Sequence, residues 1–326
     1  MLRTTLRAPD ALPLRTRLLY GSGMIAFGVK DHGFSALLML FYNQVIGLPA
    51  AWVGSAIMIA MIADALLDPL LGQMSDNFRS RWGRRHPFMY AAAVPIAIAY
   101  LLLWMPPSAS HGVQFIWLVA SAIAVRFSIS VYEIPSTALL AEFTSDYDER
   151  TKLVAMRYFF GVCGAILMAV ITFGYFLRPT AAQPVGHLNA AGYITYAWAS
   201  AGIMMVSVLA SALGTQKEIL KRPPPPPPER ASIGQMLREM IGIMAHPAYV
   251  SILLASLFFA VTSGLYTALA VYFSTYFWEL SASQIATVAS ASTVGIFLAF
   301  VVVLPISARY GKKQSAMLMF ALSLVV

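Results

Sequence analysis

The amino-acid sequence predicts an all-α polytopic membrane protein. Three observations support this: the composition, the length of the apolar runs, and the placement of the basic residues. Of the 326 residues, 59% are hydrophobic and only 11% are charged, whereas soluble domains carry about 25% charged residues. So few charged side chains cannot cover a water-facing surface, which excludes a soluble enzyme, a disordered chain and a disulfide scaffold. The single cysteine, Cys163, cannot form an internal disulfide.

Eight apolar runs have the length that crosses a membrane. A helix that rises about 1.5 Å per residue needs about 20 residues to span a hydrocarbon core of about 30 Å. The breaks between the runs carry turn residues, such as Gly47, Pro49 and Pro106. A ninth run begins near Lys313 and is still apolar at Val326. The eight runs lie at residues 19–46, 50–76, 87–106, 112–142, 152–178, 191–213, 247–277 and 282–307.

The basic residues gather at alternate ends of these runs, which predicts the orientation. Arg178 is the one Lys or Arg in the other set of loops. Because cytoplasmic loops are enriched in Lys and Arg, we expect a cytoplasmic N-terminus, and the net charge of +8 then gives no reason to expect a nucleic-acid partner. The clustered residues are Arg3, Arg7, Arg15, Arg17, Arg79, Arg81, Arg84, Arg85, Arg150, Lys152, Lys217, Lys221, Arg222, Arg230, Arg238, Arg309, Lys312 and Lys313.

We expect three domains along the chain. Residues 1–213 would form an N-terminal six-helix transmembrane bundle, 214–246 a cytoplasmic linker, and 247–326 an incomplete C-terminal bundle. Six prolines at 223–228 form a stiff spacer of about 19 Å; a ligand for a proline-binding module is the alternative. Residues 232–244 are predicted to form a short amphipathic helix on the membrane surface.

One short motif occurs twice. Residues 81–85 follow the second run and residues 309–313 follow the eighth, and both read basic, aromatic, Gly, basic, basic. The two copies lie six helices apart, which indicates an internal repeat; two basic loops that match by chance are the alternative. Two parallel halves of six helices are the architecture of the major facilitator transporters. The chain would then hold one complete half and part of the second, about eight or nine of an expected 12 helices, and we expect it to be truncated.

The second run carries two acids, Asp64 and Asp68, whose i, i+4 spacing places them on one helical face. Two carboxylates about 6 Å apart repel each other by roughly 3 kcal/mol at an effective dielectric constant of about 20. A proton or a Na⁺ ion between them removes that repulsion. The alternative is an ion pair with a basic residue of a neighbouring helix, for which the candidates are Lys30, Arg126 and Arg157.

Other charged residues also lie inside the runs. Glu133 and Arg157 could neutralise each other, or could bind adjacent hydroxyls of a polyol, since Glu accepts and Arg donates hydrogen bonds. Lys30 and Asp31 either form a local pair or line a cavity. Arg126 has no assigned role at this point.

Several of these motifs resemble the glycoside–pentoside–hexuronide:cation symporters, a family of major facilitators that includes a melibiose permease. The similarity covers about residues 18–215 well. The motifs that carry it are Asp64-Ala65-x-x-Asp68-Pro69-x-x-Gly72, the loop at 79–87, Glu133-Ile134-Pro135, the segment at 146–153, and Arg157-Tyr158-Phe159-Phe160.

The resemblance implies a secondary active transporter that couples H⁺ or Na⁺ to symport of a sugar or glycoside. A major facilitator carrier of a lysolipid or other amphipathic solute is the alternative. The implied cation-binding residues are Asp64, Asp68 and Ser130. The implied substrate-binding residues are Glu133 and Arg157, and we add Lys30 and Asp31 as candidates because they could line the cavity. The implied conformational loop contains Arg81, Gly83, Arg84 and Arg85.

The remaining expectations concern partners and location. We expect no enzymatic activity, because no hydrolase triad, zinc motif or phosphate loop is present. No cofactor is expected besides the coupling ion, and no metal besides Na⁺ at Asp64 and Asp68. We expect a monomer in the bilayer of a bacterial inner membrane, with a small hydrophilic solute as its partner.

Three departures from the family pattern bear on which ion and which solute we expect. Leu67 stands where the melibiose-transporting member has an amide, which removes an oxygen ligand and favours protons over Na⁺. Thr137 stands where that member has a tryptophan that stacks on the sugar ring. The Lys30–Asp31 pair is shifted by three positions. We therefore do not predict melibiose as the solute.

Overall fold

The computed structural model describes residues 12–178, 186–221, 245–279 and 282–323, together with positions 234, 238 and 242. All regular structure within these ranges is helical. The chain divides into two compact units, Met1–Pro224 and Pro225–Val326. The prolines at 223–228 and most of the expected surface helix at 232–244 lie outside the described residues.

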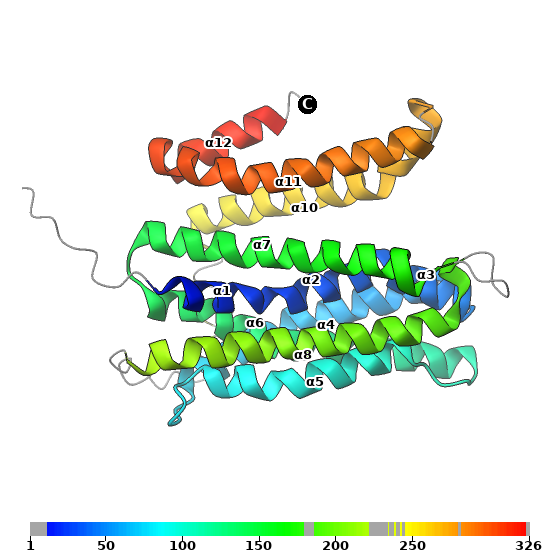
Figure 1. Ribbon diagram of the computed structural model, residues 1–326, viewed down its shortest axis with the longest axis horizontal. Coiled ribbons are helices and arrows are strands. Elements are labelled where there is room, and N and C mark those ends of the chain that lie inside the picture. Colours follow the sequence, from blue (N-terminus) through cyan, green and yellow to red (C-terminus); the bar gives the residue numbers. More distant parts are fainter. Residues whose placement is uncertain are drawn as a thin grey trace, which may run out of the picture. The chain divides into compact units, whose positions relative to one another are not determined.

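The first unit contains six helical segments that are long and apolar enough to cross a membrane (Figure 1). The first segment consists of α1 (Leu14–Ser22), α2 (Met24–His32), the π-helical turn η1 (Gly33–Leu37), α3 (Leu38–Leu40) and the π-helical turn η2 (Phe41–Val45). The others are α4 (Ala50–Asn77), α5 (His86–Trp104), α6 (His111–Phe143), α7 (Tyr147–Ile171) with the π-helical turn η3 (Thr172–Phe176), and α8 (Ala190–Leu220), which follows the short 3₁₀ turn η4 (Gly186–Leu188).

The expected runs agree with these helices, with three clear differences. The first segment begins at Leu14 and not at residue 19, because the turn that holds Arg15 and Arg17 is helical but not apolar. The fifth helix begins before residue 152 because the Asp146 side chain caps it, accepting a hydrogen bond of 2.7 Å from the Glu149 backbone N–H. The sixth helix continues past residue 213 because its last turns contact α5. There Thr215 lies 3.0 Å from His86 Nε2, and the Tyr90 hydroxyl donates to Gln216 at 2.8 Å.

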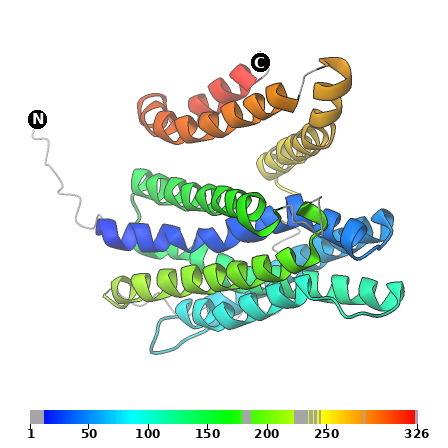
Figure 2. The same cartoon turned by 45° about the vertical axis from the view of Figure 1, so that its right-hand side comes forward.

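Within the first unit, α2 packs against α7, α4 packs against α6, and α5 packs against both α6 and α8 (Figure 2). The contact between α2 and α7 depends on small residues. A Cβ atom at Gly28 would overlap the carbonyl oxygen of Gly161, and one at Gly164 would lie 2.8 Å from the carbonyl oxygen of Ile25. Such close backbone approach is typical of small residues in membrane helices.

The second unit contains α10 (Pro247–Tyr272), the π-helical turn η5 (Phe273–Phe277), α11 (Ala282–Tyr310) and α12 (Lys312–Ser323). Residues Pro247–Tyr266 of α10 form the seventh segment apolar and long enough to span a membrane. The apolar stretch of α11 is shorter, Val294–Ser307. These three helices lie where the seventh, eighth and ninth runs were expected.

Backbone geometry supports the internal repeat. In the described part of the chain, four residues have a positive φ: Gly47 (89°), Gly83 (91°), Glu279 (51°) and Gly311 (76°). Gly47 and Glu279 each follow a π-helical turn, η2 and η5 respectively. Gly83 and Gly311 occupy the same place in the repeated basic motif. The two units therefore make the same turns at corresponding positions.

We predict that Gly28→Ala destabilises the protein by about 1–3 kcal/mol, the usual cost of overpacking. The added methyl group would force α2 away from α7. The measurement is the thermal unfolding temperature of the protein in detergent, with Gly202→Ala as control, because a Cβ at Gly202 meets no atom within 4 Å. Equal unfolding temperatures for the two variants would contradict the close contact.

Candidate functional site

Asp64 and Asp68 lie on α4, at its contact with α6. Asp64 forms an ion pair with Arg126: its Oδ2 is 2.7 Å from Arg126 Nη2 and accepts a hydrogen bond of 3.0 Å from Arg126 Nε. Its other oxygen, Oδ1, accepts a hydrogen bond of 3.1 Å from the Ser130 hydroxyl. Of the three basic candidates from the sequence, the structure therefore pairs Arg126 with Asp64.

Asp68 has a different environment, one helical turn further along α4. In the described part of the chain it forms no ion pair, and its Oδ1 atom is buried without a hydrogen-bond partner. The Ser130 hydroxyl and the charges of Asp64 and Arg126 act on it. Buried polar atoms normally find a partner. Of the four carboxylate oxygens of this pair, Asp68 Oδ1 is thus the buried one that lacks a partner.

Arg157 is held by other side chains of the protein and not by Glu133. Its Nη1 donates to the hydroxyls of Tyr20 (3.0 Å) and Ser136 (2.8 Å). Its Nη2 donates to the Thr137 hydroxyl (2.8 Å) and to the Met24 sulfur (3.2 Å). Arg157 on α7 therefore connects α1, α2 and α6.

Glu133 and Lys30 complete the group of charged residues inside the first unit. Glu133, half-buried on α6, interacts electrostatically with Arg157 and Lys30 but forms an ion pair with neither in the described chain. The sequence-based alternative of a resting Glu133–Arg157 ion pair is therefore wrong. Lys30 is buried, and its Nζ lies 3.9 Å from the centre of the Phe27 ring. Asp31 is exposed beside it.

We call Lys30, Asp64, Asp68, Arg126, Glu133 and Arg157 the interior charge cluster. Its members come from α2, α4, α6 and α7 and interact electrostatically with one another. Three carry a positive and three a negative formal charge. Ionisable residues within membrane helices are costly, so they face the interior or a water-filled cavity and commonly serve transport.

The sequence did not identify several of these contacts. Three of the four residues that hold Arg157, namely Tyr20, Met24 and Ser136, are common in membrane helices and gave no signal. Arg126 was one of three candidate partners of the acids. Its spacing of four residues from Ser130, on the same face of α6, is the signal that could have singled it out.

The loop after α4 is fixed by a carboxylate of α6. Both Arg84 Nε and Arg85 Nε donate to Glu142 Oε1 at 2.6 Å, and Arg85 also pairs with Asp76 at 2.9 Å. Gly83 has the positive φ that its turn requires. The Arg81 guanidinium lies 5.5 Å from the centre of the Trp82 ring. The expected conformational loop is thus an ion-paired turn between α4 and α5.

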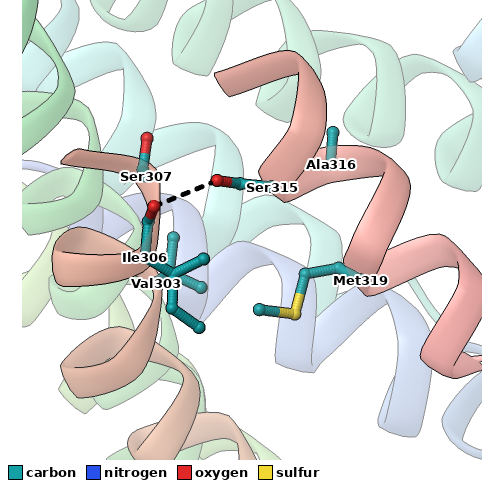
Figure 3. Close-up of a pocket in the computed structure, with 6 residues that line it drawn as sticks. All are labelled: Val303, Ile306, Ser307, Ser315, Ala316 and Met319. Atoms are coloured by element: carbon teal, nitrogen blue, oxygen red, sulfur yellow. Dashed lines mark hydrogen bonds between the residues drawn. The ribbon is translucent and has the colours of Figure 1, made fainter. Parts of the chain in front are cut away.

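One cavity, of about 200 Å³, lies between α11 and α12 in the second unit (Figure 3). It is lined by Val303, Ile306, Ser307, Ser315, Ala316 and Met319. The Ser315 hydroxyl donates to the Ile306 carbonyl oxygen at 3.3 Å. With no charged lining residue, this cavity does not fit the hydrophilic solute expected from the sequence. Within the described ranges, no three His, Cys, Asp or Glu side chains come together as a metal site.

Comparison with known proteins matches residues 19–326 to the family described as MFS/sugar transport protein. Over 168 residues, half of this chain, it is 37% identical to 31% of an uncharacterized symporter, sll1374, of Synechocystis. Over 162 residues, again half of this chain, it is 33% identical to 34% of the isoprimeverose transporter of Lactiplantibacillus pentosus. Over an aligned length of 162 residues, half of this chain, it is 28% identical to 35% of the inner membrane symporter YicJ of Escherichia coli. The aligned part spans about a third of these relatives.

We predict that Arg157→Gln lowers the free energy of unfolding by at least about 2 kcal/mol, because it removes a buried charged donor from several partners at once. Thermal unfolding in detergent measures this, with the loop substitution Arg81→Gln as control. An Arg157→Gln protein that unfolds at the wild-type temperature would show that Arg157 is not a structural anchor.

We predict that Glu142→Gln speeds backbone amide hydrogen exchange in residues 78–85 by about tenfold, which corresponds to a loss of about 1.4 kcal/mol. The substitution removes the negative charge that Arg84 and Arg85 share. The control is Glu218→Gln, whose partner is the exposed Lys221. Unchanged exchange in the loop of the Glu142→Gln protein would refute the proposed role of this carboxylate.

Proposed function

The chain belongs to the MFS/sugar transport protein family, and we propose that it is a secondary active transporter, in which H⁺ or Na⁺ moves together with a sugar or glycoside. It is a multi-pass membrane protein, with seven membrane-length apolar helices among its described residues. We place it in a bacterial inner membrane, as the name of the related YicJ protein suggests, with its N-terminus in the cytoplasm as the basic loops predict.

The observation that carries this proposal is the position of the two acids of α4. Both lie at the contact with α6, among the interior charge cluster, and neither is fully exposed. Asp64 is neutralised by Arg126, so the three side chains Asp64, Asp68 and Arg126 together carry one net negative charge. One added positive charge at Asp68 would make this group neutral.

Such a change in charge provides a mechanism for coupling. A neutral group can pass through the conformational change of a transporter at lower cost than a charged one, so binding of the cation would favour the rocking motion between the two sides of the membrane. One positive charge moved inward gains about 2.3 kcal/mol per 100 mV. That energy supports roughly 50-fold accumulation of the solute at about 1.36 kcal/mol per tenfold.

For the solute we propose contacts to Glu133 and Lys30. Both belong to the interior charge cluster, and neither forms an ion pair in the described part of the chain. A carboxylate and an ammonium group can accept and donate hydrogen bonds to neighbouring hydroxyls. Arg157 already donates four hydrogen bonds to the protein, and we assign it to holding the site together. Asp31 is exposed beside Lys30 and would contact solute at the rim.

We predict that solute uptake into membrane vesicles depends on an imposed H⁺ or Na⁺ gradient, and that Asp64→Asn combined with Asp68→Asn abolishes this dependence. Isoprimeverose, the solute named for a relative, is the first probe, followed by other glycosides and a lysophospholipid. The control is Asp148→Asn, an exposed acid in the first turn of α7. Uptake that ignores the gradient in the wild type, or that stays coupled in the double variant, would contradict the proposal. Uptake of the lysophospholipid alone would favour an amphipathic solute.

A further inference from the structure

Arg126 occupies the position that an external cation would need at Asp64. Its guanidinium approaches one carboxylate oxygen through two nitrogens, at 2.7 and 3.0 Å. The second oxygen accepts the Ser130 hydroxyl at 3.1 Å. The contact is partly shielded, with side-chain exposures of 19% for Arg126 and 17% for Asp64. Both oxygens of Asp64 are therefore already engaged by the protein.

The surroundings hold the guanidinium in this place. Arg126 lies over the ring of Phe34, 5.9 Å from its centre, and Phe34 belongs to the π-helical turn η1. The other charged side chains that interact with Asp64 are Asp68 on α4, Glu133 on α6 and Lys30 on α2. Lys30 is a second positive charge that interacts with Asp64. An alkali cation at Asp64 would have to take the place that the Arg126 guanidinium already fills.

Sodium binding also requires several oxygen ligands around one ion. The sequence around the acids offers Asp64, Asp68 and the Ser130 hydroxyl, while Leu67 contributes no oxygen. Of these three, Asp64 is paired and Ser130 donates its hydrogen to Asp64. The residues present thus do not fit a Na⁺ ion shared between the two carboxylates.

We infer that Arg126 acts as a built-in cation at Asp64 that excludes Na⁺ from the acid pair, so that this protein couples to protons and not to sodium. The inference rests on the proposed cation coupling and specifies the ion. Arg126 is a positioning residue in this account, because it acts on the coupling ion through Asp64. Substituting a neutral residue for Arg126 would give the acid pair a second uncompensated negative charge and open it to Na⁺.

The test measures Na⁺ binding to the purified protein by its effect on thermal unfolding, with NaCl compared with choline chloride at equal ionic strength. We expect no specific Na⁺ effect on the wild type. Arg126→Gln should gain a saturable stabilisation by Na⁺, with affinity raised on the order of 100-fold, which is the effect of removing one like charge about 6 Å away at an effective dielectric constant near 20. Adding Asp64→Asn to that variant should abolish the gain, and Arg126→Lys should retain the exclusion.

The outcomes separate this inference from the proposed function, because the assay involves no transport. Two results overturn the inference: a saturable, Asp64-dependent stabilisation of the wild type by Na⁺, or no stabilisation by Na⁺ of an Arg126→Gln protein that folds. Proton-coupled uptake is then judged separately by the transport assay. If Arg126→Gln folds only in Na⁺, the inference is supported. If it misfolds in Na⁺ as well, Na⁺ cannot take the place of the guanidinium and the inference is overturned.

Discussion

Compensation of charge inside an apolar helix bundle is the constraint on which this structure depends. Charged side chains are costly in a membrane interior unless they are paired or solvated. The first unit meets this cost with the ion pair between Asp64 and Arg126 and with the hydrogen bonds that surround Arg157. Of the two acids on α4, Asp68 has no ion pair in the described part of the chain, and its Oδ1 atom is buried without a hydrogen-bond partner. The site therefore carries a residual charge where a coupling ion would act.

Helix packing makes this arrangement possible. Gly28 and Gly164 let α2 and α7 approach so closely that an added Cβ would contact backbone atoms. That approach brings Arg157 on α7 within reach of Tyr20 and Met24. Elsewhere in the first unit, α4 packs directly on α6, which places Asp64 against Arg126. Small residues thus set the distance between α2 and α7 on which the hydrogen bonds of Arg157 depend.

The sequence predicted the helices well and their partners poorly, for physical reasons. Apolar length and Gly or Pro breaks are local signals, so the helix bounds agreed within a few residues except at the basic start of α1, the capped start of α7 and the packed end of α8. Spacing along one helix reveals a shared face, such as that of Asp64 and Asp68, but not which residue of the neighbouring helix lies opposite. Lys30, Arg126 and Arg157 were equivalent candidates until the packing of α4 on α6 singled out Arg126.

In the proposed mechanism, the coupling cation neutralises the single uncompensated negative charge of the acid pair when solute moves. The most direct measurement is the charge-to-solute ratio, obtained by recording the transport current and the solute flux together in proteoliposomes with isoprimeverose, or whichever glycoside is taken up. The account predicts one positive charge per solute molecule, since Asp64, Asp68 and Arg126 together carry one net negative charge. A flux that carries no net charge, or two charges per solute, would contradict it.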